Sequence, residues 1–239
     1  MTTLMHLDEV LEETVRQSGT LLKQFFGQRL NVATKESISH VVTEADLRSE
    51  KLAIDLIRAT FPTHGIISEE LGTIVGESNY SWVIDPLDGS SNFTAGLPWF
   101  GVMICILEGG VPLMARHYLP QFDLMYSCIR GEGVKRNGDA IALSEASALK
   151  EILCSIGMDA GDPDETEKQI RILKEIVLRV RNIRATNSLV DFCYTLEGRL
   201  GGIVNFGCKI WDIIGSALMF EELGGKLTEL DGKPLVFEL

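Results

Sequence analysis

Apolar residues near the start of the chain recur at helical spacing, which predicts an amphipathic helix over about residues 4–25. A second helix is predicted over about 43–61, where Thr43 and Asp46 have the spacing of a capping box. The apolar stripe predicted for this second helix is Leu47, Ile54, Ile57 and Phe61.

The pattern then changes to short apolar runs separated by turn residues, which indicates strands. The runs at 65–68 and 82–85 have the character of buried strands. Three further runs predict an antiparallel meander, at 100–107, 111–118 and 124–128. The pair Asn137-Gly138 marks another hairpin turn.

Strands and helices alternate in the last part of the chain. Strands are predicted over 152–156, 183–186, 201–206 and 227–230, and helices over 163–180, 189–196 and 212–223. This alternation predicts a layered sandwich of the α+β or α/β class. We expect one compact unit with an N-terminal half at 1–145 and a C-terminal half at 146–239.

The net charge of -12 argues against nucleic acid as a partner, because binding its phosphates requires a basic surface. It does not argue against a small phosphorylated metabolite, since bound divalent cations reverse the local sign. No apolar run is long enough to span a membrane, and we expect a soluble, cytoplasmic protein without a membrane partner. The five cysteines lie in apolar stretches and predict small buried residues in a reducing compartment.

The segment Asp85-Pro86-Leu87-Asp88-Gly89-Ser90-Ser91 carries the most specific chemistry. Asp85 follows an apolar strand, Pro86 predicts a turn, and the residues from Gly89 onward suit the start of a helix. Two carboxylates then point at one spot together with the backbone N–H groups of a helix N-terminus, which suits magnesium beside a phosphate. A surface turn capped by aspartate is the alternative.

Carboxylates also lie at the ends of three other predicted elements. Asp46 begins an early helix, Glu69-Glu70 follows a strand, and Asp212 begins a late helix. Each has a simpler reading as a helix cap or a solvated pair. Together they have the distribution expected of a site assembled from dispersed segments.

These residues carry a resemblance to the inositol monophosphatase family, within the lithium-sensitive, metal-dependent sugar phosphatases. The run from Trp82 to Phe93 is similar to the family's W-[VI]-[IV]-D-P-[IL]-D-G-[ST]-x-N-F signature, and Trp211-Asp212 with Gly224-Gly225 is similar to a second one. The resemblance implies an αβαβα sandwich, two to three Mg²⁺ ions and a homodimer.

The resemblance also implies a role for each matched residue. The implied metal ligands are Glu69, Asp85, the Leu87 carbonyl, Asp88 and Asp212. The implied catalytic residues are Glu69, Ser90 and Asp46, the last two orienting the attacking water. The implied substrate contacts are Gly89, Ser90, Asp88, Ser188, Asn205 and Lys35. Lys35 has an alternative reading as a solvated surface residue.

Several positions depart from the family pattern. His40 stands where many relatives have aspartate, and Asn205 stands where inositol-hydrolysing relatives often have glutamate. Ile214 replaces a small residue, and the loop at 184–188 is one residue shorter than usual. Lys209 is a candidate for binding a second anionic group, or else a surface lysine.

The function expected from these features is Mg-dependent hydrolysis of a small sugar or polyol phosphate such as an inositol 1-phosphate. Histidinol phosphate, fructose 1,6-bisphosphate and nucleotide 3′-phosphates are alternative substrates within the same family. A non-catalytic metal-binding interaction protein with the same fold is the alternative from another class.

Overall fold

The computed structural model describes residues 3–30, 32–34, 41–143, 148–159 and 161–237. Its first two helices, α1 (Thr3–Phe25) and α2 (Glu44–Thr60), confirm the two predicted helices. The capping box is also confirmed, because the Thr43 side chain accepts from the start of α2 while Asp46 accepts from the Thr43 backbone. Leu47 is a correction: it is 52% exposed and lies off the buried face. That face instead consists of Ala45, Asp46, Ser49, Glu50, Ala53 and Ile57.

The larger sheet has eight strands in the order β10-β9-β8-β7-β6-β5-β3-β4. Its strands are β3 (Gly65–Ser68), β4 (Gly72–Ile74), β5 (Tyr80–Asp88), β6 (Gly101–Glu108), β7 (Val111–Leu119), β8 (Leu124–Ile129), β9 (Val134–Arg136) and β10 (Asp139–Ala140). The β6–β7–β8 meander and the turn at Asn137-Gly138 are confirmed. β1 (Val32–Thr34) and β2 (Val41–Thr43) form a separate antiparallel pair.

Strand β5 does not end at Asp85 as the sequence suggested. It continues to Asp88, and its pairing with β6 shifts between these two residues, so that two residues of β5 oppose one of β6. Pro86 lies inside this bulge, where the hydrogen bond that proline cannot donate is not required. The bulge turns the strand at the point where the carboxylates lie.

The smaller sheet has three parallel strands in the order β12-β11-β13. The elements of this half are η1 (Leu149–Glu151), β11 (Leu153–Gly157), α4 (Pro163–Val177), β12 (Asn182–Arg184), α5 (Leu189–Leu196), β13 (Gly202–Asn205) and α6 (Ile210–Glu222). The predicted strand at 227–230 is wrong: only one isolated bridge, between Thr228 and Pro234, forms there. The Asp231-Gly232 turn is too closely followed by Pro234 for a regular ladder to continue.

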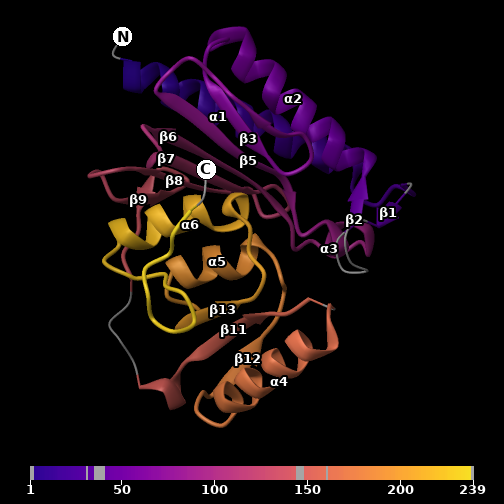
Figure 1. Ribbon diagram of the computed structural model, residues 1–239, viewed down its shortest axis with the longest axis vertical. Helices are drawn as coiled ribbons and strands as arrows, with labels where there is room; N and C mark the ends of the chain where they lie inside the picture. The colour runs from indigo at the N-terminus through magenta and orange to yellow at the C-terminus, as the bar shows by residue number, and fades with distance from the viewer. Residues whose placement is uncertain (1–2, 31, 35–40, 144–147, 160, 238–239) are drawn as a thin grey trace.

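Five layers stack in the order helix, sheet, helix, sheet, helix (Figure 1). Helices α1 and α2 cover one face of the larger sheet, α5 and α6 lie between the two sheets, and α4 covers the outer face of the smaller sheet. The predicted αβαβα sandwich is confirmed. The division at residue 145 stays a prediction. None of the helices in the described ranges has the length and apolar character that crossing a membrane requires.

The larger sheet has a hydrophobic core on each face. Alternate residues of β5 divide between them, so that Trp82 and Ile84 pack toward α1 and α2 while Val83 packs toward α5 and α6. Every residue of β5 from Trp82 to Leu87 is buried, so the end of the strand is held rigidly between the two cores.

Helix α6 approaches β7 closely at Gly215. A Cβ added there would lie 2.8 Å from Nε2 of His117 and 3.3 Å from Cβ of Ala115. His117 is fully buried, so its ring has no open space into which it could move. Glycine therefore sets the distance between α6, which carries Asp212, and the sheet.

We expect Gly215→Ala to reduce the free energy of unfolding by about 1–3 kcal/mol, because the added methyl overpacks this contact. Urea unfolding would measure the loss. Gly202→Ala is the control, since a Cβ at Gly202 meets no atom within 4 Å. Equal stability of the two variants would contradict the close-approach argument.

Candidate active site

A cavity of about 450 Å³ opens where β3, β5, β11, β13 and the start of α6 come together. Nearly all the predicted site residues that the structure describes line it. These are Glu69, Asp85, Leu87, Asp88, Gly89, Ser90, Ser188, Asn205 and Asp212. Asp46 lies behind Ser90, and Lys35 and His40 lie outside the described residues.

The end of β5 presents the first two carboxylates. Asp85 is 2% exposed, and one of its oxygens accepts a hydrogen bond of 3.1 Å from the Leu87 amide inside the bulge. Asp88 accepts from the amide of Leu189, the first residue of α5. The next residue, Gly89, has a φ of 83°, and a Cβ there would lie 2.6 Å from the Trp99 carbonyl oxygen. Only glycine fits this turn into the short helix α3 (Ser90–Thr94).

Two more carboxylates come from other elements. Glu69 follows β3 directly. Asp212 lies in the first turn of α6, where it accepts a 2.5 Å hydrogen bond from the Lys209 amide. The four carboxylates therefore reach one cavity from three separate parts of the chain.

Burial and mutual repulsion raise the pKa values of these acids. Burial raises the pKa of Asp88 to about 8, and the charges of Asp212 and Glu69 add to the increase. Burial also raises the pKa of Asp212 to about 7, with a further contribution from Glu69. The pKa of Asp85 rises well above its ordinary value, through burial and then the charge of Glu69. Bringing these charges together is unfavourable unless a cation neutralises them.

The chemistry of the donors suits a hard divalent cation. All the side-chain donors are carboxylate oxygens, and the Leu87 carbonyl adds a neutral oxygen, which is the ligand set of Mg²⁺ rather than of zinc. As these side chains are placed, the described residues contain no group of three or more His, Cys, Asp or Glu side chains close enough together to hold a metal ion. The fit to the magnesium ions that the resemblance implies rests on the chemistry of these donors, which are all oxygens lining one cavity.

A hydrogen-bonded chain lies beside the carboxylates. Oγ of Ser90 lies 2.6 Å from Oδ1 of Asp46 and 2.9 Å from the Leu87 carbonyl oxygen. The other carboxylate oxygen of Asp46 accepts from both the amide and the hydroxyl of Thr43, at 2.8 and 2.6 Å. Asp46 is fully buried, and burial raises its pKa despite these bonds. The structure thus brings Ser90 and Asp46 together, as the resemblance implied.

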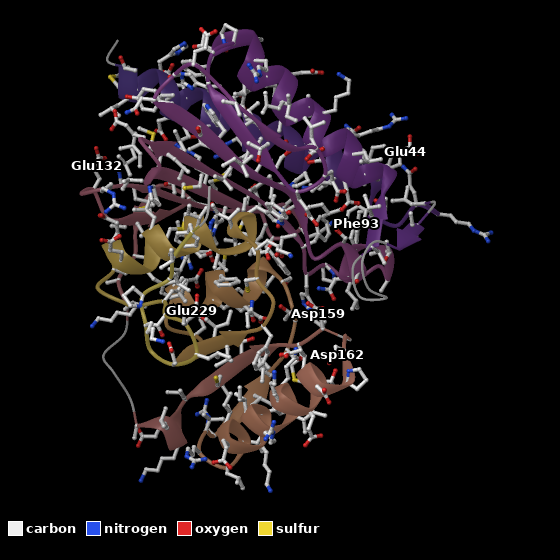
Figure 2. The ribbon with its side chains drawn as sticks, viewed as in Figure 1. Glu44, Phe93, Glu132, Asp159, Asp162 and Glu229 are labelled. Atoms are coloured by element: carbon white, nitrogen blue, oxygen red, sulfur yellow. The ribbon has the colours of Figure 1, made fainter. Side chains whose placement is uncertain are left out.

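The opposite wall comes from the smaller sheet and the loop before α5. Ser188 and Asn205 line it together with Asn187, whose side-chain amide donates to Asp159 at 3.0 Å. Asp159 lies on the same side of the molecule as Phe93 of α3 (Figure 2). A Cβ added at Gly157 would lie 2.4 Å from Oδ1 of Asn205 and 2.5 Å from Oδ1 of Asn187. This wall is therefore built around a glycine on which two amide side chains converge.

Several residues of the site were not singled out from the sequence, although two of them lie in the segments 154–161 and 205–209 that were expected to determine substrate specificity. Asp159 and Cys208 line the cavity, and the half-buried position of Cys208 there corrects the expectation of a core residue. Glu50 and Asp191 do not line the cavity, but each binds backbone amides of a segment that does. For Glu50 the sequence held one signal: the polar pair Ser49-Glu50 falls at positions that belong to the buried face of α2.

The layered fold and the acidic cavity define a protein suited to hold divalent cations beside an anionic substrate. The inositol monophosphatase family matches residues 3–239. The chain therefore belongs to the inositol monophosphatase family, a family of phosphatases, and the resemblance is confirmed.

Individual relatives carry different names. A protein of Aquifex aeolicus named fructose-1,6-bisphosphatase/inositol-1-monophosphatase is 32% identical over 232 residues, 95% of this chain and 86% of that protein. The Nus factor SuhB of Haemophilus influenzae is 30% identical over 219 residues, 90% of this chain and 82% of that protein. The solved structure of the extragenic suppressor protein SuhB from Bartonella henselae is 28% identical, covers 95% of this chain and 89% of its own, and has a TM-score of 0.90.

The raised pKa values predict how stability depends on pH when Mg²⁺ is removed by a chelator. Asp88 and Asp212 titrate near pH 7 to 8 in the folded protein and near pH 4 when unfolded. Between these values the folded state binds more protons, so the free energy of unfolding falls as pH rises, by up to about 1.4 kcal/mol per pH unit for each proton.

Urea unfolding from pH 5 to 8 in EDTA would measure this slope. Asp212→Asn should flatten it, as should excess Mg²⁺ on the unmodified protein, whereas the exposed control Asp139→Asn should not. A wild-type slope of zero would show that the carboxylates do not repel one another as described.

Proposed function

We propose that this protein is a magnesium-dependent phosphomonoesterase that hydrolyses a small sugar or polyol phosphate of the inositol 1-phosphate kind. The convergence of four carboxylates on one cavity, with pKa values raised by burial and by one another, carries the proposal. Family membership and an oxygen-only donor set support it.

Two to three magnesium ions would share these ligands. Glu69, Asp85 and the Leu87 carbonyl would hold the first, and Asp85, Asp88 and Asp212 the second. Glu69 would also contribute to a weaker third. When bound, such ions supply positive charge to the phosphoryl oxygens and lower the pKa of bound water. The backbone of Gly89 and Ser90, at the first turn of α3, would contact the phosphate.

The chain's own residues orient the water that attacks. Ser90 has one hydroxyl proton, and the 2.6 Å contact places it toward the Asp46 carboxylate. The lone pairs of Ser90 are then left to accept a hydrogen bond from a water molecule in the cavity. Thr43 donates twice to Asp46 and so fixes the carboxylate that orients Ser90. This series of hydrogen bonds would direct a lone pair of the attacking water oxygen toward the phosphorus. Its contribution to catalysis is therefore positional.

The leaving group would lie against Ser188, Asn205 and Asn187. These side chains are neutral, and they favour a leaving group rich in hydroxyls over one with a second phosphate. Histidinol phosphate, fructose 1,6-bisphosphate and a nucleotide 3′-phosphate remain the alternatives that a substrate panel separates. Lys209 also lines the cavity and is the candidate contact for a second anionic group.

Phosphate release from these four substrate classes in the presence of Mg²⁺ would test the proposal. We expect the highest kcat/KM with the inositol monophosphate and a loss of more than about 100-fold in Asp88→Asn, since even outer-shell changes at metal sites cost 10- to 100-fold. Asp139→Asn should retain activity, because this residue is exposed and outside the cavity. Strong hydrolysis of histidinol phosphate with little of the inositol ester would refute the polyol assignment.

Ser90→Ala should lower kcat by about 100-fold, because misplacing the attacking water by about 1 Å costs on the order of 100-fold. Ser90→Thr is the matched control, since it retains the hydroxyl and should retain most of the activity. Steady-state kinetics at saturating Mg²⁺ would compare them. Full activity in the alanine variant would exclude Ser90 from orienting the water.

A non-catalytic interaction protein remains the alternative from a different class, and the name Nus factor belongs to relatives such as that of Haemophilus influenzae. The intact carboxylate set of this chain favours catalysis instead. Absence of phosphate release from every panel member, while Mg²⁺ binding still weakens in Asp88→Asn, would favour this metal-binding alternative. A homodimer and a cytoplasmic location are further expectations, and sedimentation of the purified protein would test the first.

A further inference from the structure

Two buried carboxylates outside the cavity each bind a pair of consecutive backbone amides. One carboxylate oxygen of Glu50, on α2, accepts from the amides of Glu70 and Leu71 at 2.9 and 3.0 Å. One oxygen of Asp191, on α5, accepts from the amides of Thr186 and Asn187 at 3.1 and 3.0 Å. The two contacts have the same geometry and lie behind different walls of the cavity.

Glu50 holds the turn that presents Glu69. Its side chain is on the buried face of α2, and the residue is only 5% exposed. A buried carboxylate is costly unless it is hydrogen-bonded, and hydrogen bonds to a charged acceptor are about twice as strong as neutral ones. The backbone directly after Glu69 is therefore fixed to a helix that also carries Asp46.

Asp191 holds the loop that faces the leaving group. The residue is 1% exposed, and Asn187, one of the residues it binds, has a φ of 50°. A non-glycine residue rarely adopts this backbone conformation, and it persists only when its surroundings enforce it. The side chain of Asn92 adds a second tie, by donating to the Thr186 carbonyl oxygen at 2.8 Å.

Neither carboxylate lines the cavity, so both act on it chiefly through the backbone they hold, although the charge of Asp191 also contributes to the raised pKa of Asp88. We infer that Glu50 and Asp191 are positioning residues that set the two walls independently: Glu50 orients the metal-ligand turn, and Asp191 orients the leaving-group loop. The expected changes in KM rest on the proposed phosphatase function. The expected fixing of the backbone rests on the hydrogen bonds alone.

Glu50→Gln and Asp191→Asn remove one charge each while keeping the shape of the side chain. In Glu50→Gln, the Mg²⁺ concentration that gives half of the full thermal stabilisation should rise by about 10-fold or more, as for other residues that orient metal ligands. KM at saturating Mg²⁺ should stay unchanged. In Asp191→Asn, KM should instead rise by about 10-fold, while the Mg²⁺ midpoint shifts much less than in Glu50→Gln, because only the charge of Asp191 and not the metal-ligand turn is affected.

Glu197→Gln is the matched control. Glu197 is a buried carboxylate too, with a side chain 6% exposed, but it binds Arg136, Arg199 and the Tyr126 hydroxyl rather than backbone amides of the cavity. Its loss should reduce stability without changing either the Mg²⁺ midpoint or KM. Any general effect of removing a buried charge is thereby separated from positioning.

Amide hydrogen exchange, with the full chain and without substrate, tests the structural part separately from activity. Exchange at Glu70 and Leu71 should be about tenfold faster in Glu50→Gln only, and exchange at Thr186 and Asn187 about tenfold faster in Asp191→Asn only. If no phosphoester is hydrolysed by the wild type, the proposed function fails while exchange and Mg²⁺ stabilisation still decide this inference.

Unchanged exchange at the bound amides would overturn it, as would equal shifts of the Mg²⁺ midpoint in both variants. Should Glu50→Gln fail to fold, Glu50→Asp keeps the charge but is one methylene shorter, and the same local loss of protection and the same midpoint shift are expected. Asp191→Glu serves in the same way for the other wall.

Discussion

The structure depends on holding several carboxylates close together and largely out of water. Asp85 is nearly fully buried, and the charges of Glu69, Asp88 and Asp212 each act on it. Such an arrangement opposes folding, because like charges at low dielectric repel strongly. It persists only where rigid packing on both sides prevents the side chains from moving apart, and here the end of β5 lies between two hydrophobic cores. The stability of those cores is therefore what makes an acidic metal site possible.

Holding the charges in place also requires that helices present polar residues inward. The buried face of α2 carries Asp46, Ser49 and Glu50 where an ordinary amphipathic helix would carry leucine or isoleucine. Each has a definite backbone or hydroxyl partner: Asp46 binds Thr43 and Ser90, Ser49 donates to the Pro86 carbonyl at 2.8 Å, and Glu50 binds the turn after Glu69. One helix thus fixes three parts of the site at once.

Much of this fold follows from local pattern. The helices, the meander and the Asn137-Gly138 turn were predictable because periodicity and turn chemistry act over a few residues. The path of β5 past Pro86 was not, because a bulge depends on pairing with β6, which is distant in sequence. Leu47 was assigned to the core for a similar reason: hydrophobic spacing cannot show that polar residues occupy the buried face instead. The carboxylates themselves were visible in the sequence, where their place at the ends of four elements suggested one site, and the family resemblance supplied the expectation that they converge.

The two walls of the cavity differ in how strongly folding constrains them. The carboxylate side is built from the end of a buried strand and from the first turn of α6, and its positions are limited by close contacts such as that of Gly89 with the Trp99 carbonyl. The leaving-group side is built largely from loops of the smaller sheet, where Asn187 is exposed and Asp159 is half-exposed. Exposed loop residues can change without disturbing a core. The carboxylate wall can therefore be retained while the opposite wall diverges, which fits a phosphatase family in which the signature around Asp85 is matched closely and individual relatives carry different names.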